Sequence, residues 1–339
     1  GYETISSSNK KYLDLLENID NKKVFIIADE SIFIKNEDSK RFKRLCEIRK
    51  KCTYALVLNG TPITKNEWDL YNQMEFLSPL ILKMDRIEFL NTFFKKIKYK
   101  KKGQQENEFY VFSEVNASYL QKLIDPYIFK CKLDLNIKEN ETYYFVPYED
   151  DDNYYSEKKK QLEKYIEKRN SSAIINMLSI LNYTASTYPE KNDLVINYIK
   201  HKQVIVFCCF LSEIEYISQK LDCYVIHGGI KKRKEIIENF KNDNKPLIMT
   251  YGVGSYSLNL QFCNEIIFTS LNFDYGKIEQ SKYRIKRIGQ EKNIKYTYFL
   301  TDLGINKLII DNLKKKQNLG NLIKEKLQKG DDIEWLKSI

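Results

Sequence analysis

Short apolar segments that end in polar turns recur along the chain, and segments with helical periodicity separate them. Strand-length apolar runs that alternate with helices are typical of parallel α/β layers, so this pattern limits the fold class more than any other feature. Strands this apolar are expected to be buried on both faces of a sheet. The predicted strands are 24–28, 54–58, 204–207, 224–226, 247–249, 266–268 and 296–300.

A chain of 339 residues is long enough for two compact domains. The pattern predicts a partial first lobe over 1–80, a helical insertion and crossover over 81–190, and a second lobe over 191–305. A basic helical tail is expected over 306–339. Four adjacent carboxylates at 149–152 predict a solvated loop, because like charges repel and resist burial, and an acidic metal cluster is the alternative for this run.

Composition excludes some classes of protein. The seven cysteines form no CxxC pair and the chain has two histidines, so a structural zinc site has few ligands, and reduced thiols favour the cytosol. No stretch approaches the roughly 20 apolar residues that span a bilayer. The net charge of +10 would attract phosphate backbones, although Lys-, Asn-, Ile- and Tyr-rich usage can equally reflect an AT-rich genome.

Two carboxylates, Asp29 and Glu30, follow the first predicted strand directly. Open α/β sheets bind ligands at the carboxyl ends of their strands. Asp29 would hold Mg²⁺ there and Glu30 would orient the water that attacks a γ-phosphate. For this pair alone, a plain turn at the end of a strand is the alternative.

The next predicted strand ends in Asn59, Gly60, Thr61 and Pro62, and a helix ending in Phe-Leu follows. Gly60 and Pro62 suit a tight turn. On its own, Gly-Thr-Pro is a turn signal and no more.

The third feature is an arginine motif, in which Gln280 precedes Arg284 and Arg287 and the segment Ile-Gly-Gln follows. A spacing of three would place both arginines on one face of a helix, where both guanidinium groups could reach one triphosphate. For Arg-x-x-Arg alone, a basic surface helix is the alternative.

In this order, the three features resemble motifs II, III and VI of the SWI/SNF-type DNA translocases of helicase superfamily two. Residues 203–214 and 227–240 resemble further blocks of that family, and 250–260 is similar to motif V, although Ser255 and Ser257 stand where the family usually has glycine. The resemblance implies an α/β fold with two RecA-like parallel-sheet lobes, the first incomplete, and a helical insertion between them. It places an ATP site in the cleft between the lobes.

The resemblance also implies site residues and partners. Glu30, Gln280, Arg284 and Arg287 would be catalytic, Asp29 would bind Mg²⁺, and Gly254 and Asn259 would contribute to the nucleotide site. Gly60, Thr61 and Pro62 would couple nucleotide state to movement, while Lys35 and Thr250 would contact nucleic acid. The implied cofactors are ATP and Mg²⁺, and the implied partner is double-stranded DNA rather than RNA, with no membrane association. The expected compartment is the cytosol of a bacterium or of a cell that hosts a phage or virus.

No G-x-x-x-x-G-K-[ST] loop occurs in the sequence, although the superfamily binds ATP phosphates with such a loop. We expect an upstream segment or a separate chain to complete the first lobe, and residues 1–339 alone to hydrolyse ATP at less than a family-like rate. The predicted function is that of an ATP-dependent nucleic-acid translocase or helicase. The alternatives are an ATPase-inactive nucleic-acid-binding or scaffold module, and the motor subunit of a restriction or phage-defence complex.

Overall fold

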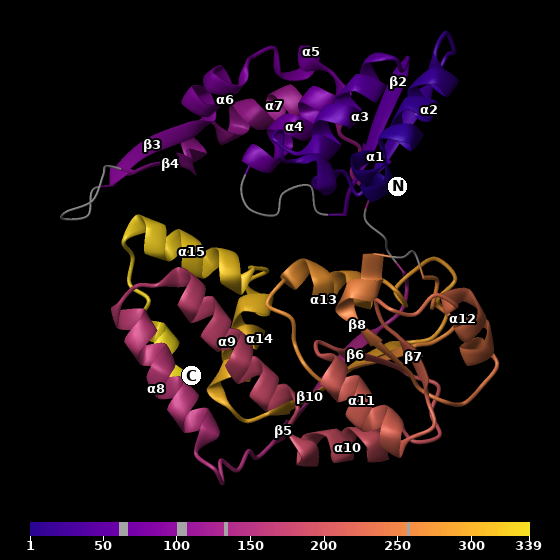
Figure 1. Cartoon of the computed structure of the whole chain (residues 1–339), viewed down its shortest axis with the longest axis vertical. Helices are drawn as coiled ribbons and strands as arrows, with labels where there is room; N and C mark the ends of the chain where they lie inside the picture. Colours follow the sequence, from indigo (N-terminus) through magenta and orange to yellow (C-terminus); the bar gives the residue numbers. More distant parts are fainter. Residues whose placement is uncertain (61–66, 100–106, 132–134, 256–257) are drawn as a thin grey trace. The chain divides into compact units, whose positions relative to one another are not determined.

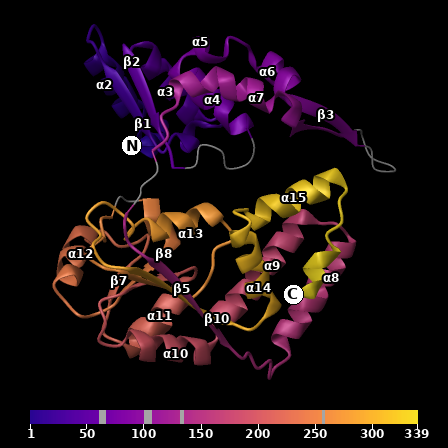
Figure 2. The ribbon, with the colours of Figure 1, turned by 180° about the vertical axis from the view of Figure 1, so that it is seen from behind.

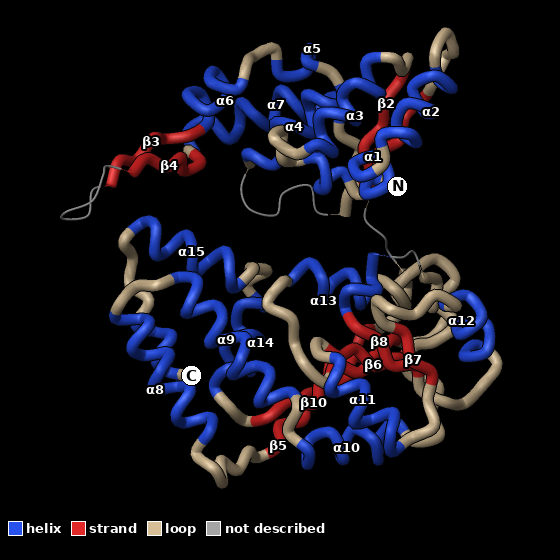
Figure 3. Tube along the Cα trace, in the orientation of Figure 1, coloured by secondary structure: helices blue, strands red, loops and turns tan. Residues whose placement is uncertain are grey.

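The computed structural model describes the chain except for residues 61–66, 100–106, 132–134 and 256–257. The chain forms two compact units, Gly1–Cys131 (unit 1) and Lys132–Ile339 (unit 2). Helices and strands alternate in both units (Figures 1 and 3). The predicted α/β class is confirmed, and each of the seven predicted strands is present with its bounds shifted by at most two residues.

Unit 1 begins with a parallel pair of strands covered on one face by helices. Strand β1 (Phe25–Asp29) pairs with β2 (Tyr54–Leu58) in the register Phe25 opposite Tyr54. Helices α1 (Tyr2–Ser7), α2 (Asn9–Ile19) and α3 (Lys40–Lys50) belong to this half, and the 3-10 helix η1 (Ser31–Ile34) follows β1. Its buried core contains Ala28, Ile34, Leu45 and Phe76.

The rest of unit 1 is helical and has its own core. It contains α4 (Trp68–Leu77), α5 (Pro79–Leu82), α6 (Arg86–Phe93), α7 (Ala117–Ile124) and the 3-10 helices η2 (Glu114–Asn116) and η3 (Asp125–Tyr127), with an antiparallel hairpin of β3 (Phe94–Tyr99) and β4 (Asn107–Phe112). Aromatic rings fill this core: the Phe89 ring lies 4.9 Å from Phe93 and 5.1 Å from Tyr71, centroid to centroid. A capping box of Asp85 and Glu88 begins α6.

The second face of the β1–β2 pair is open in unit 1. Because side chains alternate along a strand, Ala28 and Val57 point into the core while their neighbours point away from it. The apolar side chains on the open face are between 40% and 67% exposed; they are Phe25, Ile27, Tyr54, Leu56 and Leu58. Within unit 1, β1 and β2 are therefore buried on one face only, because no described element of unit 1 covers the other face; an uncovered face is what we expect of a first lobe that lacks its phosphate-loop segment.

Unit 2 is built on a six-stranded sheet with the order β5-β10-β9-β6-β8-β7, and every neighbouring pair is parallel. Figure 2 labels β5, β7, β8 and β10 of this sheet. The strands are β5 (Glu139–Val146), β6 (Ile205–Cys208), β7 (Tyr224–Ile226), β8 (Leu247–Thr250), β9 (Glu265–Phe268) and β10 (Ile294–Thr301). The sequence pattern did not predict β5, whose first half is polar. It pairs with β10 over eight residues at the edge of the sheet.

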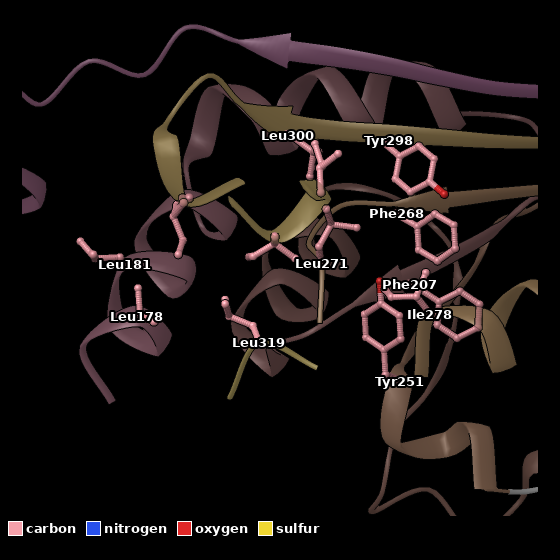
Figure 4. Close-up of a cluster of buried hydrophobic side chains, with 14 of the residues drawn as sticks. Leu178, Leu181, Phe207, Tyr251, Phe268, Leu271, Ile278, Tyr298, Leu300 and Leu319 are labelled. Carbon is pink, nitrogen blue, oxygen red and sulfur yellow. The ribbon is translucent and has the colours of Figure 1, made fainter. Parts of the chain in front are cut away.

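Helices cover both faces of this sheet. Helices α10 (Pro189–Ile199) and α11 (Leu211–Lys220) pack on one face, against Val206, Ile248 and Ile267. The opposite face meets α9 (Ser171–Ser186), α12 (Arg233–Lys241), α13 (Tyr275–Lys282) and α14 (Gly304–Lys314). Figure 4 shows the aromatic part of this core, where the rings of Phe207, Tyr251 and Phe268 stack next to Tyr298.

The two units divide the chain differently from the four predicted segments. Helix α8 (Tyr154–Glu167) and α9 contribute Leu162, Ile174 and Leu181 to the core of unit 2, and α4 to α7 belong to unit 1. The segment 306–339 is not an appended tail, since α14, α15 (Leu319–Lys329) and η5 (Glu334–Ser338) add Ile323, Leu336 and Ile339 to the same core. These helices have apolar faces that need a partner. In the described residues, no helix is long and apolar enough to cross a membrane.

Candidate functional site

The carboxylates Asp29 and Glu30 lie at the carboxyl end of β1, as predicted. Asp29 is exposed, and its side chain accepts a hydrogen bond of 3.0 Å from the Glu30 amide. Glu30 has φ 53° and ψ 53°, in the left-handed region. Such a backbone costs a residue with a side chain on the order of 1–3 kcal/mol, and strained residues of this kind cluster at functional sites. The turn that follows β1 therefore holds Glu30 in a strained backbone conformation.

Tyr2 of α1 is hydrogen-bonded to this end of β1. Its hydroxyl donates a hydrogen bond of 2.5 Å to the carbonyl oxygen of Asp29, and its ring packs beside Phe33 and the guanidinium of Arg41. Burial, and then the charges of Asp29 and Glu30, raise the pKa of Tyr2 to about 12. The phenol therefore stays protonated and remains a donor at physiological pH.

A buried polar network connects the acidic strand end with the end of β2. The Ser31 hydroxyl donates to Oε1 of Gln73 at 2.6 Å, and the Asn59 amide donates to both groups at 3.3 Å. Gln73 in turn donates from Nε2 to the carbonyl oxygen of Asp69 at 2.6 Å. Ser31 and Gln73 are buried, so these bonds tie the two predicted motifs to α4. The sequence analysis missed Ser31 and Gln73 as site residues, because neither carries a motif signal.

The proposed coupling turn is described only at its start. Gly60 follows Asn59 directly, whereas Thr61 and Pro62 lie outside the described residues. Lys35, predicted to contact nucleic acid, lies 3.5 Å from the buried carboxylate of Asp69, and its carbonyl oxygen accepts from Asn72 at 2.6 Å. Lys35 is thus anchored to α4 by charge and by backbone.

In unit 2 the structure brings Arg287 and Asn259 together. Nη1 of Arg287 donates to the side-chain oxygen of Asn259, and Nε donates to the carbonyl oxygen of Tyr283 at 2.8 Å. The backbone amide of Leu260 donates to the carbonyl oxygen of Arg284 at 3.2 Å. The loop that carries Asn259 and the arginine segment therefore form one hydrogen-bonded site, which their distance in the sequence did not reveal.

The prediction that both arginines lie on one helical face is wrong. Helix α13 ends at Lys282, and Arg284 and Arg287 lie in the turns that follow it. Ile285 turns into the core, and Gly289 has a φ of 96°, which a continued helix does not allow. As a result, the Arg284 side chain is buried and the Arg287 side chain is half-buried.

The other predicted residues of unit 2 have separate positions. Gln280 is exposed on α13, and Thr250 is the half-buried last residue of β8. Gly254 lies in the 3-10 helix η4 (Tyr251–Ser255), which follows β8. In the described residues, none of these three side chains or backbones hydrogen-bonds to the Arg287–Asn259 pair.

A buried ion pair lies next to the carboxyl ends of β6 and β9. Nζ of Lys191 donates to the carbonyl oxygens of Ser186 and Thr269, and it lies 3.6 Å from Oε1 of Glu213. Glu213 also accepts from the hydroxyl groups of Thr269 and Ser270 at 2.8 and 2.7 Å. Burial lowers the pKa of Lys191, and the charge of Glu213 opposes that shift. The sequence analysis did not single out this pair.

The side chains at the end of β1 fit the Mg²⁺ that ATP chemistry needs. Mg²⁺ prefers oxygen ligands and is usually held by one or two carboxylates together with substrate phosphates. The exposed carboxylate of Asp29 offers one such ligand. The described residues contain no group of three or more His, Cys, Asp or Glu side chains that could hold a metal ion.

Residues 1–202 match the SNF2-related domain family, and residues 190–289 match the family of the helicase conserved C-terminal domain. Since the first match covers more than half of the chain, this protein belongs to the SNF2-related family. The predicted resemblance is confirmed.

Individual relatives are distant. The chain is 21% identical to an uncharacterized ATP-dependent helicase of Mycoplasma pneumoniae over 87% of this chain and 30% of that protein. It is 24% identical to the human DNA annealing helicase and endonuclease ZRANB3 over 99% of this chain and 33% of that protein. It thus spans about a third of these relatives. The SWI2/SNF2 ATPase core domain of Sulfolobus solfataricus is 20% identical, with 98% and 74% coverage and a TM-score of 0.46.

Proposed function

We propose that this chain is part of an ATP-dependent translocase or helicase that acts on double-stranded DNA. The observation that carries the proposal is the Asp29–Glu30 pair at the carboxyl end of β1 in a member of the SNF2-related family. The names of the relatives, ATP-dependent helicase and DNA annealing helicase, agree with this chemistry. The absence of a phosphate-loop motif from residues 1–339 is the observation on the side of an ATPase-inactive module, and ATP turnover by the full-length polypeptide decides between the two.

In this proposal each acidic residue has one role. Asp29 is the carboxylate ligand of Mg²⁺, which would neutralise charge on the phosphates of ATP. Glu30 accepts a proton from the attacking water, and its left-handed backbone sets the direction of the carboxylate. Arg287 supplies positive charge where negative charge develops on the transferred phosphoryl group, and Arg284 and Gln280 support that segment.

Two further proposals concern coupling and nucleic acid. The hydrogen bonds among Ser31, Asn59 and Gln73 would transmit a change at the acidic strand end to the segment of Gly60, Thr61 and Pro62.

For contact with the DNA backbone we propose Lys35, Thr250 and the exposed basic turn that begins α12. That turn contains Lys231, Lys232 and Lys234, all exposed. Cations at such positions bind phosphates without regard to sequence.

We also propose that a segment carrying the phosphate loop, from the same polypeptide or from a separate chain, packs on the open face and edges of the β1–β2 pair. The support is the row of exposed apolar side chains on that face. Contiguous apolar patches and unpaired strand edges are rare on free protein surfaces, because both promote association. The phosphate loop that the sequence lacks normally belongs to such a sheet.

The proposed function predicts that Glu30→Gln in the full-length natural polypeptide lowers ATP turnover by about 10²-fold or more, because a general base typically contributes that much. ATP hydrolysis would be measured with and without duplex DNA, in a phosphate-release assay. DNA binding should stay within about twofold. An unchanged turnover in Glu30→Gln, or no turnover in the wild type with DNA present, would exclude the proposed ATPase.

The open-face proposal predicts the behaviour of the double variant Ile27→Lys/Leu56→Lys. Because both side chains are already exposed, the free energy of unfolding of unit 1 should change by less than about 1 kcal/mol. Binding of the dye anilinonaphthalene sulfonate to the chain should fall, and capture of a phosphate-loop segment supplied in trans should be lost. Leu80→Lys, which adds one lysine at an exposed site on α5, is the control for added charge away from the open face. Equal dye binding by the double variant and the control would contradict the proposal.

A further inference from the structure

A two-stranded hairpin in unit 1 is exposed on both of its faces. Strands β3 and β4 pair antiparallel, with Phe94 opposite Phe112 and Lys96 opposite Tyr110. In the described residues no third strand joins them, and the hairpin extends away from the helices of unit 1 (Figure 1). An isolated hairpin of two strands is marginally stable at best in water, so this hairpin depends on the packing at its base.

The base of the hairpin is fixed to the aromatic core of unit 1. Phe94 is buried, and its ring lies 5.6 Å from Phe112 and 6.2 Å from Trp68, centroid to centroid. Where the chain enters and leaves the hairpin, the backbone amide of Ser113 donates a hydrogen bond of 2.8 Å to the carbonyl oxygen of Phe93. These contacts set the direction in which the hairpin leaves the core.

Beyond the base, lysine side chains lie on both faces of the hairpin. Because successive side chains of a strand point to opposite faces, Lys95 and Ile97 share one face and Lys96 lies on the other. Tyr110 of β4 is the cross-strand neighbour of Lys96. All four side chains are exposed. A sheet that packs against other protein has one apolar face, whereas each face of this hairpin carries a cation.

We propose that the β3–β4 hairpin binds in the major groove of double-stranded DNA. This inference rests on the DNA-binding function proposed above and assigns one of its contacts. Paired strands lie about 4.8 Å apart, and the major groove of B-DNA is about 12 Å wide and admits a two-stranded ribbon. Phosphates border this groove on both sides, so a ribbon with a cation on each face can contact both DNA backbones through Lys95 and Lys96.

The arrangement of the lysines favours DNA over the other polyanions that a basic hairpin can bind. An acidic protein partner would pack on one face or pair with one edge, and the lysine on the other face would then have no role. Double-stranded RNA has a major groove that is too deep and narrow for side chains to enter. Since contacts with phosphates carry no sequence information, the hairpin would contribute affinity without sequence specificity.

The test measures binding of a fluorescent DNA duplex by the full-length natural polypeptide without ATP. Lys95→Gln/Lys96→Gln should weaken binding about tenfold or more at roughly 100 mM salt. It should also lower the slope of log Kd against log salt concentration by about 2, because each lost phosphate contact removes about 1. Lys10→Gln/Lys11→Gln removes the same charge from two exposed, adjacent lysines of α2 and should leave both quantities nearly unchanged. Equal effects of the two double variants, or no duplex binding by the wild type, would overturn the proposal.

A second measurement assigns the groove. A glucosyl group attached through C5 of cytosine occupies the major groove, where the methyl group of thymine also lies, and it leaves the charge of the duplex unchanged. Such groups should weaken binding by the wild type several-fold more than binding by Lys95→Gln/Lys96→Gln. RNA duplexes of the same length should bind the wild type more weakly than DNA. Equal weakening of both proteins by glucosylation, or equal affinity for RNA and DNA, would contradict insertion into the major groove.

Two controls separate this inference from folding and from the ATPase. Lys95→Arg/Lys96→Arg keeps both cations and should bind DNA within about threefold of the wild type, whereas a loss as large as that of the glutamine variant would rule out a role for charge. Competition by polyglutamate as effective as that by DNA would indicate an acidic protein partner instead. Binding that depends on Lys95 and Lys96 supports the inference even if the polypeptide hydrolyses no ATP, and that second result would contradict only the proposed ATPase.

Discussion

Arg287→Ala in the full-length natural polypeptide should lower the turnover of ATP by about 10³-fold or more while changing the affinity for duplex DNA little. Arginines that neutralise a transferred phosphoryl group contribute factors of this size. Arg287 is held by the Tyr283 carbonyl and by Asn259, and within the described residues its Nη2 has no hydrogen-bond partner. The guanidinium is thus oriented by the protein but retains a donor for a ligand.

The measurement is steady-state ATP hydrolysis with saturating DNA, with kcat and KM determined separately. Arg287→Lys should recover only a small part of kcat, because an ammonium group cannot reproduce the planar fork of a guanidinium. Lys292→Ala removes an exposed cation a few residues away and should leave kcat unchanged. A rise in KM with kcat unchanged would assign Arg287 to nucleotide affinity and would contradict a role in the chemical step.

Lys191→Met should lower the free energy of unfolding of unit 2 by about 3–5 kcal/mol. Removing one partner of a buried ion pair leaves the other charge uncompensated, and such losses have this magnitude. The ammonium of Lys191 lies 3.6 Å from Glu213, and both side chains are at most 1% exposed. Because Glu213 also binds Thr269 and Ser270, the loss would loosen the ends of β6 and β9 together.

Urea denaturation followed by tryptophan fluorescence can measure this effect, because Trp335 packs against the core of unit 2. Lys220→Met removes a lysine from an exposed ion pair with Asp193 and should cost less than about 1 kcal/mol. Adding Glu213→Gln to Lys191→Met should recover part of the loss, since the uncompensated charge is removed. A loss of less than about 1 kcal/mol in Lys191→Met would show that the pair is not needed for stability.

The sequence was sufficient for seven of the strands, the fold class and the family. Apolar runs such as 204–207 and 247–249 predict buried parallel strands, because a segment with no polar side becomes stable only inside a sheet covered on both faces. The sequence also predicted the Asp29–Glu30 pair at the end of β1, because a motif of two adjacent residues contains all the groups that define it.

Tertiary structure decided what depends on neighbours that are distant in the chain. Strand β5 has polar residues in its first half and becomes a strand because β10 supplies its hydrogen bonds. The arginine segment leaves the helix at Lys282 because Ile285 enters the core, and only the fold brings Arg287 to Asn259. Burial and pairing are properties of three-dimensional contacts. Only the structure could therefore show the open face of β1 and β2 and the buried Lys191–Glu213 pair.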